Sequence, residues 1–305
     1  MLQIIADGLI IGSIISLGAI GLSLTLSIVR FSNFSHGELL GWGSYLALSA
    51  LAAFTAVHAG LATPLGPFSF GWGLLAALLV AALLTAGLAL LLDTVLFKRL
   101  RSQGSITLVI ASFGAALALR NLLLFWYGGV PQYYSQNLQI SLPLLPRSVW
   151  GGLRVTADQM LVFVLTIATV TLLHLFLRYS TMGRSMRATA FNPGLARVSG
   201  IDPEQVLRVT LIIGGLLAAV AGVFAGITVQ LRPTMGVDLL LPLFAAVILG
   251  GIGSVWGAVL GGLIVGLAES LAVSVVGAEY RAAAAFAVLI TILLVRPNGL
   301  FGEKA

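Results

Sequence analysis

The chain has 305 residues, of which 59% are hydrophobic and 9% are charged, and its mean hydropathy is +1.09. Soluble domains carry roughly 25% charged residues, so this composition excludes a protein that is surrounded by water. The net charge of +6 does not indicate a nucleic-acid partner, because the basic residues lie between apolar runs. The sequence contains no cysteine, which excludes disulfides and thiolate chemistry.

Long uncharged runs predict an all-α, polytopic membrane protein in which residues 1–305 form a single transmembrane domain. A helix needs about 20 apolar residues to cross the hydrocarbon layer. We expect 8–9 crossings, some of them short or broken by glycine, and we place them at residues 4–29, 38–58, 73–97, 105–127, 158–177, 209–230, 239–252, 257–276 and 282–296. Residues 239–276 also fit a re-entrant pair. No basic residue precedes the first run, which favours a retained helix over a cleaved signal peptide.

The basic residues predict the orientation of these crossings. With nine crossings and the C-terminus in the cytoplasm, the inner loops hold Arg30, Lys98, Arg99, Arg101, Arg178, Arg184, Arg187, Arg197, Arg208, Arg296 and Lys304. The outer loops hold only Arg147, Arg154, Arg232 and Arg281. Because basic loops stay on the cytoplasmic side, we expect the N-terminus outside and the C-terminus inside. Residues 128–157 then form a long external loop, and residues 178–208 form a basic internal loop.

The first polar motif, at residues 33–38, reads N-F-S-H-G-E. Ser35 and Glu38 have the spacing of a capping box, with Phe34 and Leu39 placed for a hydrophobic staple. The functional alternative is a polar site at the membrane boundary, and the two interpretations are compatible because a helix N-terminus also attracts anionic groups.

Small residues recur at four-residue spacing in two parts of the chain. Gly8, Gly12 and Ser16 form one stripe, and the second part has Gly253, Gly257, Gly261 and then Gly262, Gly266. Such stripes predict close helix packing in lipid. The run at residues 249–253, L-G-G-I-G, is expected to break a short crossing, and broken helices often line substrate paths in transporters.

A few charged residues fall within or beside the predicted crossings. Arg120 and Glu269 are expected to face the protein interior and pair, or to reach the outer interface. Asp93 is expected to pair with Lys98 or Arg99. His58 and His174 are isolated, and no spacing in the sequence is typical of a metal site.

The internal loop has clear helix signals. Asn192 followed by Pro193 predicts an N-cap and first helical position, and Gly200 predicts the stop of a short helix over residues 193–199. Asp202 and Pro203 repeat the start signal, with Gln205 at capping-box spacing. This helix could rest on anionic lipid or dock a partner protein. The chain lacks a G-x-x-x-x-G-K-[ST] motif, so it has no P-loop for ATP.

Four segments resemble the permease subunits of branched-chain amino acid ABC importers: N-F-S-H-G-E at 33–38, R-Y-S-x-M-G-R-x-x-R-A from Arg178, V-I-L-G-G-I-G-S-V-W-G-A-V-L-G-G within 246–262, and V-R-P-N-G-L-F-G at 295–302. Importers of urea, short amides and aromatic acids are similar in these segments. The resemblance implies a second homologous permease, two cytoplasmic ATPase subunits that bind ATP and Mg²⁺, and a periplasmic solute-binding protein, all at the inner membrane of a prokaryote.

The resemblance also implies that residues 184–201 couple the chain to an ATPase subunit. The coupling candidates are Arg184, Arg187, Ala188, Asn192, Pro193, Leu195, Ala196, Arg197, Gly200 and Ile201. The candidates for the substrate path are Ser13, Ser16, Asn33, His36, Glu38, Gly250, Gly251, Gly253 and Glu269. We expect no catalytic residue and no cofactor on this chain itself.

Three rival functions remain open. In an ion-coupled secondary transporter, Glu38 and Glu269 would carry a proton or coordinate sodium. In a passive channel, a selectivity filter such as T-V-G-Y-G is expected, and the sequence has none. A scaffold that transports nothing is the third possibility.

Overall fold

The computed structural model of the protein describes residues 1–135, 137, 141–146, 152–296 and 299–301. The long helices are α1 (Leu2–Val29), α2 (Ser35–Val57), α3 (Trp72–Leu92), α5 (Ser105–Tyr127), α6 (Ala157–Tyr179), α9 (Pro203–Thr228), α10 (Met235–Gly250), α11 (Val255–Val275) and α12 (Arg281–Val295). The shorter elements are a π-helical segment at Asp93–Phe97, α4 (Lys98–Leu100), α7 (Thr181–Phe191), α8 (Pro193–Val198), and 3-10 turns at Ala59–Ala62, Arg101–Gln103 and Ala278–Tyr280. Arg147, Lys304 and residues 297, 298 and 302 of the C-terminal motif lie outside the described residues.

Eight helical segments of the described chain are long and apolar enough to cross a membrane, which confirms the predicted fold class. The predicted crossing at residues 239–252 corresponds to α10, which begins earlier, at Met235, and has 16 residues. At 1.5 Å rise per residue α10 is shorter than the hydrocarbon thickness, and it contains Pro242. The short helix expected near the glycine run is therefore present.

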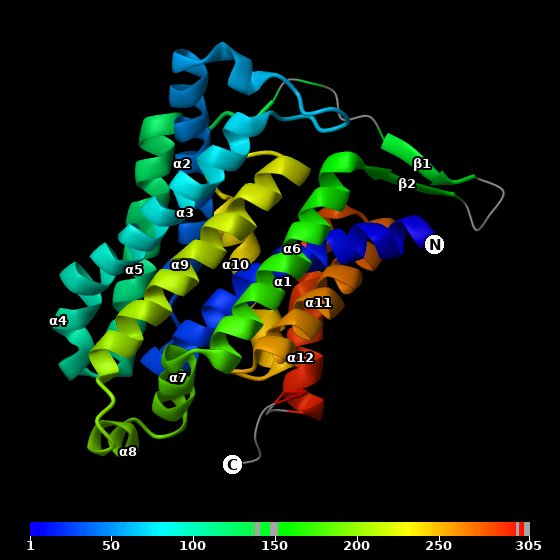
Figure 1. Cartoon of the computed structure of the whole chain (residues 1–305). Coiled ribbons are helices and arrows are strands. Elements are labelled where there is room, and N and C mark those ends of the chain that lie inside the picture. Colours follow the sequence, from blue (N-terminus) through cyan, green and yellow to red (C-terminus); the bar gives the residue numbers. More distant parts are fainter. Residues whose placement is uncertain (136, 138–140, 147–151, 297–298, 302–305) are drawn as a thin grey trace.

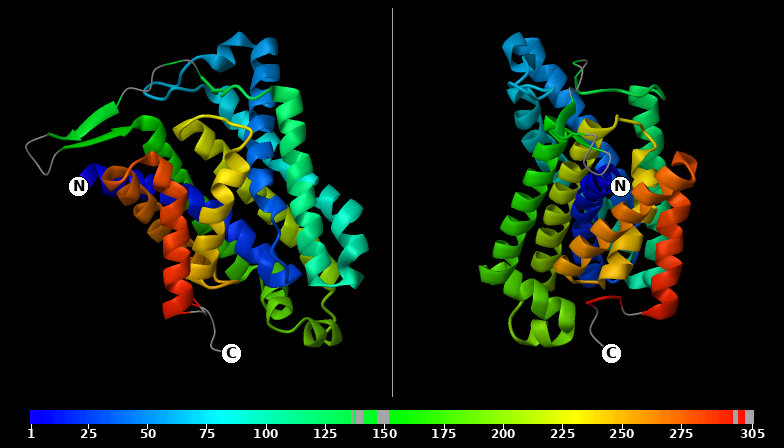
Figure 2. Two further views of the ribbon diagram at one scale, coloured as in Figure 1. Left: turned by 180° about the vertical axis from the view of Figure 1, so that it is seen from behind. Right: turned by 90° about the vertical axis from the view of Figure 1, so that its right-hand side faces the viewer.

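The long helices form one bundle around α1, which runs through its middle (Figures 1 and 2). Helices α1 and α9 are largely covered by their neighbours, whereas α12 is almost bare. Helices α7 and α8 extend from the end of the bundle to which residues 299–301 also return (Figure 1), and we call this the α8 end. At the opposite end, Gln3 of α1 accepts a hydrogen bond from the Arg154 amide at 2.9 Å. The described termini therefore lie at opposite ends.

Small residues bring α1 and α11 into close contact, as their spacing predicts. A Cβ atom on Gly12 would lie 2.8 Å from the Leu263 Cα atom, and one on Gly262 would lie 2.6 Å from the Ser16 nitrogen. The Ser16 hydroxyl donates to the Val259 carbonyl at 2.9 Å across the same interface. Gly261, on another side of α11, faces the backbone of Ala246 in α10. Two glycine faces on one helix thus hold three helices together.

The loop at residues 128–157 contains a β-hairpin that the sequence did not predict. Strand β1 (Ser141–Leu145) pairs antiparallel with β2 (Leu153–Thr156), with an irregular register between Pro143 and Leu145. We call this end of the bundle the hairpin end. The strand β2 leads directly into α6, where Thr156 and Gln159 form a reciprocal capping box.

Candidate coupling site and translocation residues

Two short helices, α7 and α8, form the basic loop at residues 178–208, at the α8 end. The Ser180 hydroxyl caps α7 by accepting from the Gly183 amide at 2.9 Å. Asn192 caps α8 by accepting from the Leu195 amide at 3.0 Å, and Pro193 occupies the first helical position. Gly200 follows with φ of +83°, a conformation that favours glycine. The structure confirms the short helix predicted over residues 193–199. Helix α7 was not predicted, because its sequence lacks an apolar run.

The outward surface of α8 combines apolar and basic side chains. Ala196 is the buried residue of α8, whereas Phe191, Leu195 and Val198 are 77%, 62% and 86% exposed. Arg197 is also exposed. We call Leu195, Arg197 and Val198 of α8, together with Phe191 at the end of α7, the α8 surface. An apolar group displayed on a short, capped helix is typical of a protein-docking site.

The remaining coupling candidates have different environments. Arg184, Ala188, Asn192 and Gly200 are exposed, and Ile201 is half-buried. Arg187 donates to the Leu177 carbonyl, so its guanidinium satisfies the last turn of α6 within this chain. Arg187 is therefore already engaged within this chain, whereas Arg197 belongs to the exposed α8 surface.

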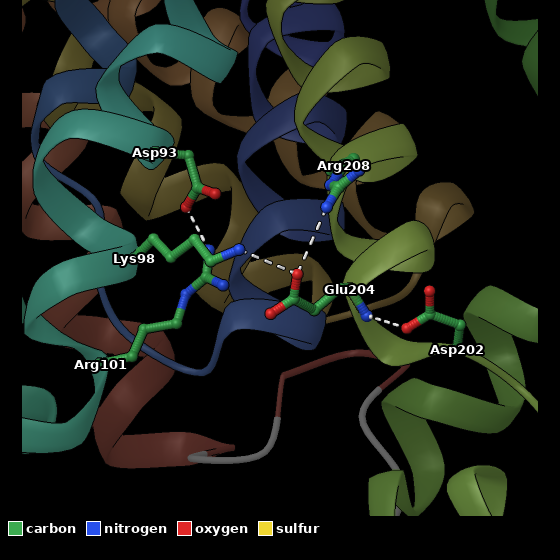
Figure 3. Close-up of polar contacts among 6 residues, drawn as sticks. All are labelled: Asp93, Lys98, Arg101, Asp202, Glu204 and Arg208. Atoms are coloured by element: carbon green, nitrogen blue, oxygen red, sulfur yellow. Dashed lines mark hydrogen bonds and ion pairs between the residues drawn. The ribbon is translucent and has the colours of Figure 1, made fainter.

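A polar network joins the start of α9 to the segment after α3 (Figure 3). Glu204 accepts from Lys98 at 3.1 Å and from Arg208 at 3.4 Å. Asp93 pairs with Arg101. The prediction that it would pair with Lys98 or Arg99 is therefore wrong. The π-helical segment at Asp93–Phe97 changes the helical phase, which explains why a partner farther along the chain is reached.

The Asp93–Arg101 pair should stabilise this junction more than the pairs of Glu204. The Asp93 side chain is 7% exposed and the Glu204 side chain 52%. We expect Asp93→Asn to lower the free energy of unfolding by about 1.5–3 kcal/mol, because a charge-assisted bond to a buried acceptor is lost. Thermal unfolding of the purified chain in detergent measures this change in the free energy of unfolding. Glu204→Gln is the exposed control, and an equal loss in both variants would contradict the assignment.

The motif at residues 33–38 does not form the predicted capping box. Helix α2 begins at Ser35, and the Ser35 hydroxyl donates to the Asn33 side-chain oxygen at 2.6 Å instead of accepting from the third helical residue. His36 Nε2 lies 3.2 Å from the Gly18 carbonyl of α1. Neither oxygen of the buried Glu38 carboxylate has a hydrogen-bond partner among the described residues. Glu38 is therefore not a cap.

The charged residues around Glu38 come from two other helices. Arg120 of α5 and Asp238 of α10 both act electrostatically on its carboxylate, although no ion pair within 4 Å joins the three in the described structure. Glu38 Oε2 faces the first turn of α10, where a Cβ atom on Gly236 would lie 2.9 Å away. Arg120 is half-buried, and no ion pair within 4 Å includes it in the described structure, so its expected pairing is not observed there.

The other path candidates lie in separate places. Ser13 and Ser16 are buried in α1, where their hydroxyls bond to the Ile10 and Gly12 carbonyls. Glu269 is buried in α11 beside Ser270, which bonds to the Ile4 carbonyl near the hairpin end. Its Oε1 atom has no hydrogen-bond partner among the described residues. The structure therefore does not gather all the predicted path residues into one cavity.

The glycine run forms the tight turn between α10 and α11. Helix α10 ends at Gly250, and Gly251 and Gly253 have φ of +95° and +87°. The Gly253 amide donates to the Ser23 hydroxyl of α1 at 2.9 Å. The C-terminal segment also meets this turn, since the Leu300 and Phe301 amides donate to the Leu249 and Gly250 carbonyls at 2.8 and 3.1 Å. The last carbonyls of α10 thus have partners.

Sequence reasoning missed several of these contacts. Nothing in the pattern places the Arg30 guanidinium 3.2 Å from the Ala190 carbonyl, which joins the end of α1 to α7. The Ser180 cap was recognisable, because a serine precedes the start of α7. Among the described residues, no group of three His, Asp or Glu side chains could hold a metal ion.

Comparison with known proteins places the whole chain in one family. The family model for the branched-chain amino acid transport system / permease component matches residues 4–295. The chain is 33% identical to the high-affinity branched-chain amino acid transport system permease protein LivH of Escherichia coli K12, covering 99% of this chain and 96% of that protein. It is 32% identical to the corresponding protein BraD of Pseudomonas aeruginosa, with the same coverage.

A solved structure supports the fold alone. PsaBC from Streptococcus pneumoniae, in complex with Fab, has a TM-score of 0.50 and 11% identity, covering 97% of this chain and 92% of that chain. The α8 surface, the eight membrane-crossing segments and the near-complete match to the family model are consistent with one another. The chain belongs to the family of permease components of branched-chain amino acid transport systems.

Proposed function

We propose that this chain is the membrane subunit of an ATP-driven importer of branched-chain amino acids in the inner membrane of a prokaryote. The observation that carries the proposal is the α8 surface, an exposed apolar group on a capped helix directly connected to α7 and α9. Relatives that are described as branched-chain amino acid permeases match over almost their full length, which supports the substrate class. Urea, short amides and aromatic acids are the alternative substrates.

The α8 surface would insert into a cytoplasmic ATPase subunit, which binds ATP and Mg²⁺. Glu204 and Asp202 stand at the start of α9, so a shift of α8 would reach α9 and, through Lys98, the segment after α3 (Figure 3). This network gives the docking helix a physical connection to two crossings. Hydrolysis itself would take place entirely on the partner.

The orientation we propose puts the α8 end in the cytoplasm. Arg30, Lys98 and Arg101 lie there with Arg178 and Arg184, as the positive-inside rule requires. The hairpin end would then receive a periplasmic solute-binding protein. A second, homologous permease would cover part of the large apolar surface that α5 and α12 leave open.

Uptake by reconstituted vesicles tests the function. The chain is combined with its second permease, its ATPase subunits and its binding protein, and radiolabelled leucine, valine and isoleucine are supplied with or without ATP inside the vesicle. We expect uptake that needs both ATP and the binding protein, and excess unlabelled leucine should compete where urea does not. Uptake driven by an ion gradient alone would contradict the proposal.

Glu38 is the path residue that we favour most, because neither oxygen of its buried carboxylate has a hydrogen-bond partner among the described residues. An unpaired buried carboxylate is costly, so its retention suggests a role in solute passage. We expect Glu38→Gln to reduce the maximal rate of uptake at least about tenfold while the complex still assembles, a change of roughly 1.4 kcal/mol in the barrier.

Glu279→Gln serves as the control for this variant, since Glu279 is exposed near the hairpin end. It should transport like the wild type. If the Glu38→Gln variant also transports at the wild-type rate and differs only in a higher thermal stability, Glu38 is a structural residue and does not line the substrate path.

A further inference from the structure

A second site lies at the α8 end, away from the docking surface. A pocket of about 340 Å³ opens between the ends of α1 and α6, helix α7 and the α10–α11 turn. Its walls are mainly apolar, with Leu24, Ile28, Leu177, Met186 and Val255. Arg178 and Arg187 also line it, and its described lining residues include no Asp or Glu. The pocket therefore combines mainly apolar walls with two positively charged side chains.

The surroundings of the pocket carry more positive charge and interfacial aromatic groups. Arg30 reaches the carbonyl of Ala190, which lines the pocket, at 3.2 Å. The rings of His174 and Trp256 are 5.1 Å apart, and Trp256 is 51% exposed. The Arg178 guanidinium lies 5.6 Å from the centre of the exposed Tyr179 ring. Tryptophan and tyrosine beside arginine are typical of the level of lipid headgroups.

We infer that this pocket binds one anionic phospholipid, with its phosphate on Arg178 and Arg187 and the upper part of an acyl chain against the apolar wall. Charge complementarity selects the occupant, because arginine forms paired hydrogen bonds with phosphate oxygens and no acidic side chain opposes them. The exposed Leu172, Leu175 and Phe176 on α6 place the pocket beside a surface that suits lipid tails. The inference does not depend on which solute the chain carries.

The site has a structural consequence. Arg187 already holds the Leu177 carbonyl at the end of α6, and Arg30 holds α7 to α1. A phosphate held by Arg178 and Arg187 would therefore connect α6 to α7 where the coupling loop begins, and the bond from Arg30 would extend this connection to α1.

Native mass spectrometry of the full chain in detergent tests the site, with phosphatidylglycerol and phosphatidylcholine of identical acyl chains as probes. We expect one phosphatidylglycerol to be retained about tenfold more tightly than phosphatidylcholine. Arg178→Gln with Arg187→Gln should remove this preference. The control, Arg154→Gln with Arg232→Gln, removes the same two positive charges from exposed residues outside the pocket and should keep the preference.

A second variant separates the pocket from general surface charge. Ala190→Leu adds bulk to the wall without removing an arginine, and it should also lower phosphatidylglycerol retention. Unchanged retention in Ala190→Leu, or equal retention of both lipids by the wild type, would overturn the inference. So would loss of the bound lipid when the complete transporter assembles, because a protein partner would then occupy the pocket.

Discussion

Replacing Ala196 with proline should abolish solute uptake while the chain still inserts into the membrane. The Ala196 amide donates to the Asn192 carbonyl at 3.0 Å, and Ala196 is the residue that α8 buries. Proline removes this bond and its ring meets the carbonyl, a loss of about 3 kcal/mol in a helix of one and a half turns. We expect either loss of the ATPase subunit on copurification or ATP hydrolysis without uptake.

Thr181→Pro is the matched control, because Thr181 is the first residue of α7 and Ser180 before it is extended, with ψ of 153°. Proline fits this first position, so assembly and uptake should persist. If Ala196→Pro assembles and transports like the wild type, α8 does not couple the chain to an ATPase. A variant that keeps the ATPase and loses function only in vesicles poor in anionic lipid would point to lipid contact instead.

The second large effect is expected at Gly250. A Cβ atom there would overlap the Gly257 carbonyl of α11, and 2.7 Å would separate it from the Ala258 nitrogen. Because both sides of the contact are backbone, the two helices must separate, and we expect Gly250→Ala to lower the free energy of unfolding by about 3 kcal/mol. Gly251→Ala and Gly253→Ala should also be unfavourable, since both need a positive φ.

Gly114→Ala provides the comparison for these variants. Gly114 lies inside α5, and apart from the adjoining backbone of its own helix no described atom lies within 4 Å of the position of its added Cβ atom. Alanine should be neutral there or stabilise the helix by up to about 1 kcal/mol. Thermal unfolding and copurification with the second permease are measured for all four variants. If Gly250→Ala behaves like Gly114→Ala, the close α10–α11 contact is wrong.

Local signals predicted local structure well in this chain. The apolar runs placed the crossings, and Asn192, Pro193 and Gly200 placed α8, because a cap and a stop act within a few residues. The small-residue stripes also predicted close packing between helices, although the pattern did not say which helices would meet.

The wrong predictions arose where the spacing of residues along the chain does not determine the structure. Ser35 and Glu38 have the spacing of a capping box, but Asn33 competes for the Ser35 hydroxyl, so α2 starts one residue earlier. Asp93 reaches Arg101 because a π-helical segment shifts the phase of the helix. The surroundings of Glu38 depend on where α5 and α10 pack, and no local pattern specifies that.

The packing of α1 against α11 has a consequence for the order of biosynthesis. Helix α1 is synthesised long before α11, the helix that its glycine stripe fits. Until α11 is inserted, the close-packing face of α1 must rest against lipid or a temporary protein partner. A polypeptide that stops before α11 would therefore leave this face of α1 without its close-packing partner, and misassembly becomes more probable at that stage.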